Sequence, residues 1–339
     1  MFSVVIPLYN MRQYIARAVK SVLDQSLDAF EIIVVDDGST DGSAAAVEAI
    51  HDPRIRLVRQ DNAGVSAARN KGISLARYDR ICFLDADDMW DAGFLEAILR
   101  LKERYPQAGI YGTGYRLVFP KGRDVEVTAA EAAHQDTTLL ITDYLHRAKS
   151  TSLLHSSGVM IPRRTFDEIG GFLVGEHYGE DQEMWTRIAL HYPVGYDTRI
   201  LFSFFQTGSE NKPRFGKIQQ YDPKVRMLER YLIENGNGPA DRDMIRSHLK
   251  SHLTNKCLSF IYANKRSAAV SYMNKNSGTW TPLLSLLVGY PPAWPFLRFF
   301  SLVYRFCNSR LMIRMVGGKR ASHGVLERLK KRSDSCHHG

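Results

Sequence analysis

The chain has 339 residues, of which 44% are hydrophobic, so it can bury a sizeable core and is long for one ordinary domain. One large folded domain with an appended part is therefore expected, and a disordered chain is excluded. The formal net charge of +9 favours an anionic partner such as a nucleotide, a lipid headgroup or a nucleic acid.

The N-terminal segment MFSVVIPLYN has neither the basic leader nor the long apolar run of a signal peptide, and we interpret it as a first strand. The cysteines are spread out and include no Cys-x-x-Cys pair, which favours reduced thiols over a disulfide framework or a zinc site. We therefore expect a cytoplasmic protein. The four cysteines are Cys82, Cys257, Cys307 and Cys336.

Four apolar, β-branched runs follow one another in the first hundred residues and are separated by helical patterns. Each run is almost entirely apolar, which is typical of strands covered on both faces. The order βαβαβαβ predicts a doubly wound, mostly parallel α/β sheet, with ligands bound at the carboxyl ends of its strands. The runs are SVVIPLY (3–9), EIIVVDD (31–37), IRLVRQ (55–60) and RICFLDADD (80–88), and the helical patterns begin near residues 15, 45 and 94.

The predicted strand ends carry acidic side chains but no phosphate-binding loop. The turn PLYNMRQ contains no glycine, which excludes a dinucleotide-binding fingerprint, and a Walker loop is absent as well. Carboxylates can hold a phosphate-bearing ligand only through a divalent cation. Asp85 and Asp87 would share one face of an ideal strand, within reach of one Mg²⁺ or Mn²⁺. For Asp88 and Asp91, capping of the next helix is an equally good interpretation.

Four segments in this order and spacing, SVVIPLYNMRQYI, EIIVVDDGSTDGS, AGVSAARNKGI and FLDADD, resemble the inverting family 2 glycosyltransferases with the GT-A fold. The resemblance implies a nucleotide-diphospho-sugar donor, first of all a UDP-sugar, and Mn²⁺ or Mg²⁺ as cofactor. An alternative for Asp36 and Asp37 is a turn before a helix. The implied donor residues are Pro7, Tyr9, Asp36 and Asp37 around the base and ribose, Arg69 near the phosphates or sugar, and Asp85 on the ribose or sugar, with Asp87 as the metal ligand.

A helix with apolar residues at helical spacing is expected to begin at Glu180 and Asp181, in the segment HYGEDQEMWTRIALHY (177–192). This segment resembles the Glu-Asp motif of the same family. The resemblance implies that Asp181 is the general base for the acceptor hydroxyl and that Glu180 supports it. An alternative is that both side chains only complement the dipole of the helix.

The composition becomes helical after about residue 220, so we divide the chain into a GT-A domain (1–220) and a helical C-terminal region (221–339). Segment 281–297 is uncharged, but its prolines make it a poor transmembrane helix. Segment 298–309 predicts an amphipathic helix within a tail of ten basic and two acidic residues from Phe296 onwards. We expect it to bind an anionic membrane surface at the inner face of the cytoplasmic membrane, or else to pack on its own domain.

The expected function is therefore inverting transfer of a sugar to a saccharide or lipid-linked acceptor in polysaccharide or cell-envelope biosynthesis. A haloacid-dehalogenase-like phosphohydrolase is one alternative, although its nucleophile ends the first core strand whereas Asp85 ends the fourth. A non-catalytic sugar-nucleotide-binding scaffold is another. No nucleic acid partner is expected, because the basic residues form no recognised reading motif.

Overall fold

The computed structural model describes residues 1–120, 124–129, 137–148, 152–176, 179–206, 223–234 and 243–253. All of these belong to one compact unit of the chain. The predicted domain boundary near residue 220 and the amphipathic segment 298–309 lie outside the described residues, and both stay predictions. Cys82 is a buried free thiol, and the other three cysteines lie outside the described residues.

Ten strands of the described residues form one mixed sheet in the order β3-β2-β1-β4-β9-β6-β10-β5, with β7 beside β6 and β8 beside β10. The first four strands are parallel, which confirms the doubly wound prediction for this half: β1 (Phe2–Leu8), β2 (Phe30–Asp36), β3 (Ile55–Arg59) and β4 (Arg80–Phe83). The other strands are β5 (Met89–Trp90), β6 (Ile110–Val118), β7 (Val125–Val127), β8 (Thr138–Ile141), β9 (Val159–Pro162) and β10 (Val194–Phe205).

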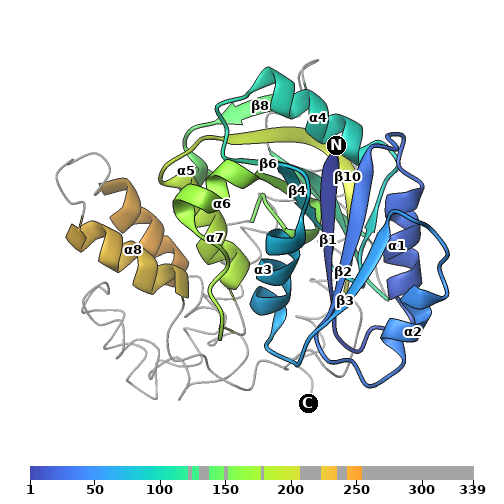
Figure 1. The fold of residues 1–339 in the computed structure, drawn as a ribbon. Coiled ribbons are helices and arrows are strands. Elements are labelled where there is room, and N and C mark those ends of the chain that lie inside the picture. Colours follow the sequence, from blue (N-terminus) through green and yellow to red (C-terminus); the bar gives the residue numbers. More distant parts are fainter. Residues whose placement is uncertain are drawn as a thin grey trace, which may run out of the picture. The chain divides into compact units, whose positions relative to one another are not determined.

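Helices cover both faces of the parallel half, which is why β1 and β2 are buried at every position. Val4 and Ile6 belong to a core cluster shared with α1, α2 and α4, whereas Ile33 and Val35 pack against Ala68 of α3. Figure 1 shows α1 and α2 on one side of β1–β3 and α3 on the other. The bounds of these helices are α1 (Ile15–Leu23), α2 (Ser43–Glu48), α3 (Val65–Leu75) and α4 (Phe94–Arg104).

The second half of the unit adds the helices α5 to α8. Helix α7 contacts α5, α6 and α8, and residues 243–253 are helical, as the sequence predicts. Among the described residues, no helix combines the length and the apolar character that a membrane crossing requires. The bounds are α5 (Tyr144–Arg147), the 3₁₀ turn η1 (Ser156–Gly158), α6 (Arg163–Ile169), α7 (Glu180–Ala189) and α8 (Pro223–Glu234).

Strand β4 ends at Phe83, so the prediction of a strand through residue 88 is wrong. Its pairing with β1 and β9 stops there, and a turn follows in which Asp88 N donates to Asp85 O at 3.0 Å. A strand buried on both faces has no place for consecutive carboxylates, because an unpaired buried charge is costly. Asp85 and Asp87 therefore do not share a strand face, and the turn determines which carboxylates meet.

Helix α3 carries two side chains of the candidate site, and its close approach to β1 depends on Gly72. A Cβ at this position would lie 2.2 Å from Cγ1 of the buried Val5. We expect Gly72→Ala to lower the free energy of unfolding in urea by about 2 kcal/mol, because the helix must move away from the sheet. Gly93→Ala is the control, since a Cβ there meets nothing within 4 Å. Equal effects of the two substitutions would contradict this packing.

Candidate active site

The carboxyl end of β1 is held against the loop that follows β2. Asn10 has a positive φ of 51°, its Oδ1 accepts a hydrogen bond from Thr40 N (2.8 Å), and its N–H donates to Ser39 Oγ (3.0 Å). The residue before it, Tyr9, is 48% exposed, whereas Pro7 is buried inside β1. The structure thus fixes the backbone at this strand end and leaves the Tyr9 ring accessible to a ligand.

Asp36 and Asp37 are both buried, but they make different contacts. Asp37 Oδ1 accepts from Gln60 Nε2 (2.7 Å) and Ala63 N (2.9 Å), and its Oδ2 accepts from Gly64 N (2.8 Å). Asp36 accepts one described hydrogen bond, from Ser39 N to Oδ1 (3.0 Å). Asp37 therefore fixes the loop that leads into α3, while Asp36 keeps more acceptor capacity for a ligand.

Arg69 of α3 joins the end of β4 to the start of α7. Its Nη2 donates to Asp85 Oδ1 (2.9 Å) and its Nη1 donates to Glu180 Oε1 (3.0 Å), with only 3% of the side chain exposed. Burial opposes the charge of the guanidinium, but the two carboxylates outweigh burial and raise the pKa of Arg69. One buried cation thus brings together two acidic groups that are far apart in the sequence.

Asp181 follows Glu180 in the first turn of α7 and is partly buried. Burial and the neighbouring Glu180 raise the pKa of Asp181 to about 6, while Arg69 acts in the opposite direction. Its Oδ1 accepts a hydrogen bond from Gln182 N (2.6 Å). A carboxylate with this pKa is suited to accept a proton near neutral pH.

Two side chains that were not singled out in the sequence hold the loop before α7. Asn70 Nδ2 donates to Phe172 O (2.8 Å), and Phe172 N donates to Asn70 Oδ1 (2.9 Å). Arg187 pairs with the buried Glu183 (2.7 Å) and donates to Gly171 O (2.8 Å). Arg69 and Asn70, which are adjacent on α3, therefore position both α7 and the loop that leads to it.

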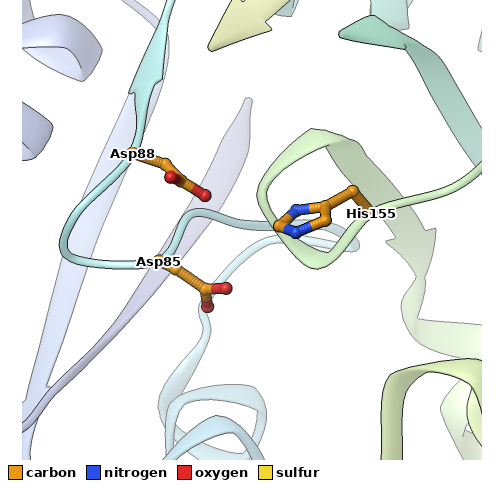
Figure 2. A group of neighbouring side chains, drawn as sticks. All are labelled: Asp85, Asp88 and His155. Carbon is orange, nitrogen blue, oxygen red and sulfur yellow. The ribbon is translucent and has the colours of Figure 1, made fainter. Parts of the chain in front are cut away.

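The turn after β4 faces a second segment, which ends in η1. Oxygens of Asp85 and Asp88 and a ring nitrogen of His155 all lie within 4.8 Å of one another. Figure 2 shows the imidazole directed toward the two carboxylates from the opposite side. Ser157 N donates to His155 Nδ1 (3.2 Å), and this hydrogen bond helps to orient the ring. Carboxylate oxygens and an imidazole nitrogen are suitable ligands for a divalent cation.

Repulsion among the carboxylates of this turn favours the binding of a positive charge there. Burial and the charges of Asp87 and Asp85 raise the pKa of Asp88 well above its usual range. Burial would raise the pKa of Asp85 too, but Arg69 and then His155 lower it. Asp88 is fully buried, and its carboxylate accepts hydrogen bonds from Ser157 Oγ and from Phe205 N (3.0 Å).

Asp87, the predicted metal ligand, is buried in the same turn. Its backbone oxygen accepts a hydrogen bond from Arg17 Nη2 (2.5 Å), and its charge acts on Asp88. The three side chains whose ligand atoms converge are Asp85, Asp88 and His155, and Asp87 is not among them. The structure therefore adds two candidate ligands, while the assignment of Asp87 stays a prediction.

Salt bridges join Arg69 to Asp85 and to Glu180, and Asp181 follows Glu180 in α7. Pro7, Tyr9, Asp36 and Asp37 lie at or just after the carboxyl ends of the neighbouring strands β1 and β2. Segment 152–158, which supplies His155 and two serines, is not among the segments that the sequence motifs single out. Ser156 Oγ donates to Asp85 Oδ2 (2.7 Å), and Ser157 Oγ accepts from Asp85 N (3.2 Å). A polar His-Ser-Ser run shortly before strand β9 is the sequence signal from which this segment could have been found.

Comparisons with known proteins give these residues a context. Residues 3–170 match the family model "Glycosyl transferase family 2". Glycosyltransferase GlyG of Streptococcus pneumoniae is 30% identical over 207 residues, which cover 60% of this chain and 67% of that protein. The putative teichuronic acid biosynthesis glycosyltransferase TuaG of Bacillus subtilis is 38% identical over 142 residues, 40% of this chain and 56% of that protein.

An uncharacterized glycosyltransferase of Rickettsia felis is 29% identical over 230 residues, 67% of this chain and 37% of that protein. The chain thus spans between 37% and 67% of the length of these three relatives. Among solved structures, S. aureus TarS 1–349 in complex with UDP-GlcNAc superposes with a TM-score of 0.67 at 18% identity, covering 90% of this chain and 91% of that one. This likeness shows the fold.

Proposed function

Because the chain belongs to glycosyl transferase family 2, we propose that it transfers a sugar from a nucleotide-diphospho-sugar to a saccharide or lipid-linked acceptor, with inversion at the anomeric carbon. The observation that carries the proposal is the pair of salt bridges from Arg69 to Asp85 and to Glu180. Through them, the acidic end of β4 and the carboxylates of α7 become parts of one site. We place the reaction in polysaccharide or cell-envelope biosynthesis, as the name of the relative TuaG suggests.

The donor nucleotide would bind at the ends of β1 and β2. The accessible Tyr9 ring can pack against a base near Pro7, and Asp36 retains acceptor capacity for a base or ribose donor. Asp37 would act by fixing residues 60–64 and hence the start of α3. A UDP-sugar is the donor we favour, since TarS has been solved with UDP-GlcNAc.

A divalent cation, Mn²⁺ or Mg²⁺, would bind at the turn 85–88, where the like charges of three carboxylates require a counter-charge. Asp87 is the ligand implied by the family, and Asp85, Asp88 and His155 offer further ligand atoms. An imidazole beside carboxylates favours Mn²⁺ over Mg²⁺. When bound, the cation supplies the positive charge that stabilises the leaving nucleoside diphosphate.

Asp181 would take the proton from the acceptor hydroxyl as its oxygen attacks the anomeric carbon. The raised pKa keeps this carboxylate basic enough to accept a proton yet ionised at neutral pH. Glu180 would hold α7 in register through Arg69, and Arg69 would keep Asp85 oriented toward the donor sugar or ribose. Attack from the face opposite the leaving group gives inversion without a covalent intermediate.

Isosteric variants of the turn test the cation site. We expect Asp87→Asn to abolish the Mn²⁺-dependent stabilisation by UDP-sugars in a thermal-shift panel. Asp85→Asn or His155→Gln should raise the apparent Kd for Mn²⁺-dependent UDP-sugar binding roughly tenfold. Asp36→Asn is the control, because it should weaken nucleotide binding with and without metal. Unchanged Mn²⁺ dependence in Asp87→Asn, Asp88→Asn and His155→Gln alike would contradict a cation at this turn.

The alternatives differ in what an assay would show. Membership of glycosyl transferase family 2 argues against the phosphohydrolase hypothesis. A non-catalytic scaffold would bind a nucleotide sugar without turning it over, so release of UDP in the presence of acceptor distinguishes it from a transferase. All carboxylates that the proposed chemistry requires are present, which favours the transferase.

We further propose that the enzyme works in the cytoplasm, peripherally at the inner face of the cytoplasmic membrane. The support is the excess of ten basic over two acidic residues from Phe296 onwards, which would be drawn to anionic lipid. Such a position would suit a lipid-linked acceptor.

A further inference from the structure

A cleft with a volume of about 660 Å³ lies outside the candidate active site. Its lining combines the start of β4, the last part of α4 and the start of α6. Five basic side chains and two carboxylates line it: Arg77, Arg80, Lys102, Arg163, Arg164, Asp79 and Asp167. Its side chains therefore carry a clear excess of positive charge.

This basic cleft is at the opposite end of the sheet from the donor residues. Arg80 is the first residue of β4 and pairs with Phe2, the first residue of β1, whereas Asp85 lies two residues beyond Phe83, the last residue of β4. Five residues of extended chain span roughly 16 Å. A ligand of the basic cleft is therefore distinct from a nucleotide at the carboxyl ends of β1 and β2.

Three of the five cations have no carboxylate partner among the described residues. Arg163 lies 3.6 Å from Asp79, and Arg77 lies 3.7 Å from Glu31. In contrast, the polar contacts of Lys102 and Arg164 are with backbone oxygens. Lys102 Nζ donates to Pro106 O (3.0 Å), and Arg164 Nη2 donates to Pro106 O (2.7 Å) and Ala108 O (3.1 Å).

The third such cation, Arg80, has a buried Nε–H without a hydrogen-bond partner among the described residues. Its guanidinium carbon lies 5.7 Å from the centre of the Phe2 ring. Burial and the charges of Arg164 and Arg80 lower the pKa of Lys102. Like charges gathered in this way oppose folding, so the arrangement is one that a bound anion would stabilise.

We propose that the basic cleft binds a phosphate group, either of a soluble phosphate ester or of a phospholipid headgroup. A phosphate accepts several hydrogen bonds at once, and guanidinium groups match its geometry. The cleft is large enough for the phosphate and part of the molecule that carries it. Asp79, with 90% of its side chain exposed, and Asp167 would lie beside the bound group and limit the cleft to compact anions.

Binding of inorganic phosphate, measured by calorimetry in EDTA, tests the proposal with no cation at the donor end. We expect saturable binding to the whole chain that is weakened roughly tenfold by Lys102→Gln and by Arg80→Gln, since each removes a charged contact. Lys71→Gln removes an equal charge from the exposed face of α3 and should leave the affinity unchanged. Equal affinities in the wild type and both cleft variants, or no saturable binding, would overturn the proposal.

Vesicles distinguish the two sources of phosphate. If a headgroup is the ligand, sedimentation with phosphatidylglycerol vesicles will be weakened by Lys102→Gln as much as phosphate binding is, relative to Lys71→Gln. If the ligand is soluble, Lys102→Gln will weaken phosphate binding alone. Lys102→Gln should fold normally, because the lysine charge opposes folding at this site. Its turnover of the sugar donor should equal that of the wild type, so a loss of phosphate binding in this variant is distinguishable from a failure of the proposed sugar transfer.

Discussion

Replacing Asp181 with asparagine is expected to reduce kcat by about a thousandfold and, at the same time, to stabilise the protein at neutral pH. The loss of activity follows because an amide cannot accept the acceptor proton. The gain in stability follows because the pKa of Asp181 is raised to about 6, so its ionisation above that pH costs the folded state free energy. The upper limit of this gain is roughly 3 kcal/mol.

The pH dependence gives the sign of the effect. A carboxyl group with a raised pKa favours the folded state while it is protonated and loses this advantage as pH rises through about 6. The stability difference between Asp181→Asn and wild type, measured as Tm, should therefore be absent below about pH 4, grow as the pH rises from about 4 to about 6, and stay constant above that. Wild-type kcat should fall as pH decreases through about 6. If Asp181 only complemented the helix dipole, the variant would lose about 0.5 kcal/mol and keep its kcat.

Replacing Arg69 with methionine is expected to cost about 3–5 kcal/mol of unfolding free energy, because it leaves Asp85 and Glu180 partly buried without their cation. Transfer activity should be lost as well, since α7 is no longer tied to the end of β4. Arg69→Lys keeps the charge, but an ammonium group cannot contact both carboxylates as a planar guanidinium does. An intermediate loss of unfolding free energy is therefore expected. Urea unfolding and kcat measure the two effects.

Arg59→Met is the matched control for Arg69, because Arg59 forms an exposed ion pair with Glu48. Its expected cost is at most about 1 kcal/mol. Adding Glu180→Gln to Arg69→Met should recover part of the lost stability, since one uncompensated carboxylate is then removed. A cost for Arg69→Met no larger than that for Arg59→Met would show that the buried salt bridges do not hold the site together.

The parallel half of the fold could be predicted from the sequence because its signals are local. Apolar runs such as residues 32–35 are buried on both faces, and the helical patterns predicted near residues 15, 45 and 94 correspond to α1, α2 and α4. The end of β4 could not be predicted in the same way. The run RICFLDADD continues in sequence, but the pairing of β4 with its neighbours stops at Phe83, and this depends on residues 159–162 far along the chain.

The candidate site was predicted where a motif lies at a strand end or a helix start, as at Asp36, Asp85 and Asp181. The contacts among these residues were not predicted. The hydrogen bond from Arg69 to Glu180 joins residues 111 positions apart in the sequence, and no local sequence pattern indicates such a contact. His155 was missed for the same reason, because only the packing of η1 against the turn after β4 gives it a role.

The central claim is that Asp181 activates an acceptor that attacks the donor sugar directly, opposite the leaving diphosphate. The anomeric configuration of the first-formed product tests it most directly, measured by ¹H NMR with an α-linked UDP-sugar and with acceptor or water as nucleophile. A β-configured product is expected for the wild type and none for Asp181→Asn. An α-configured product would contradict it.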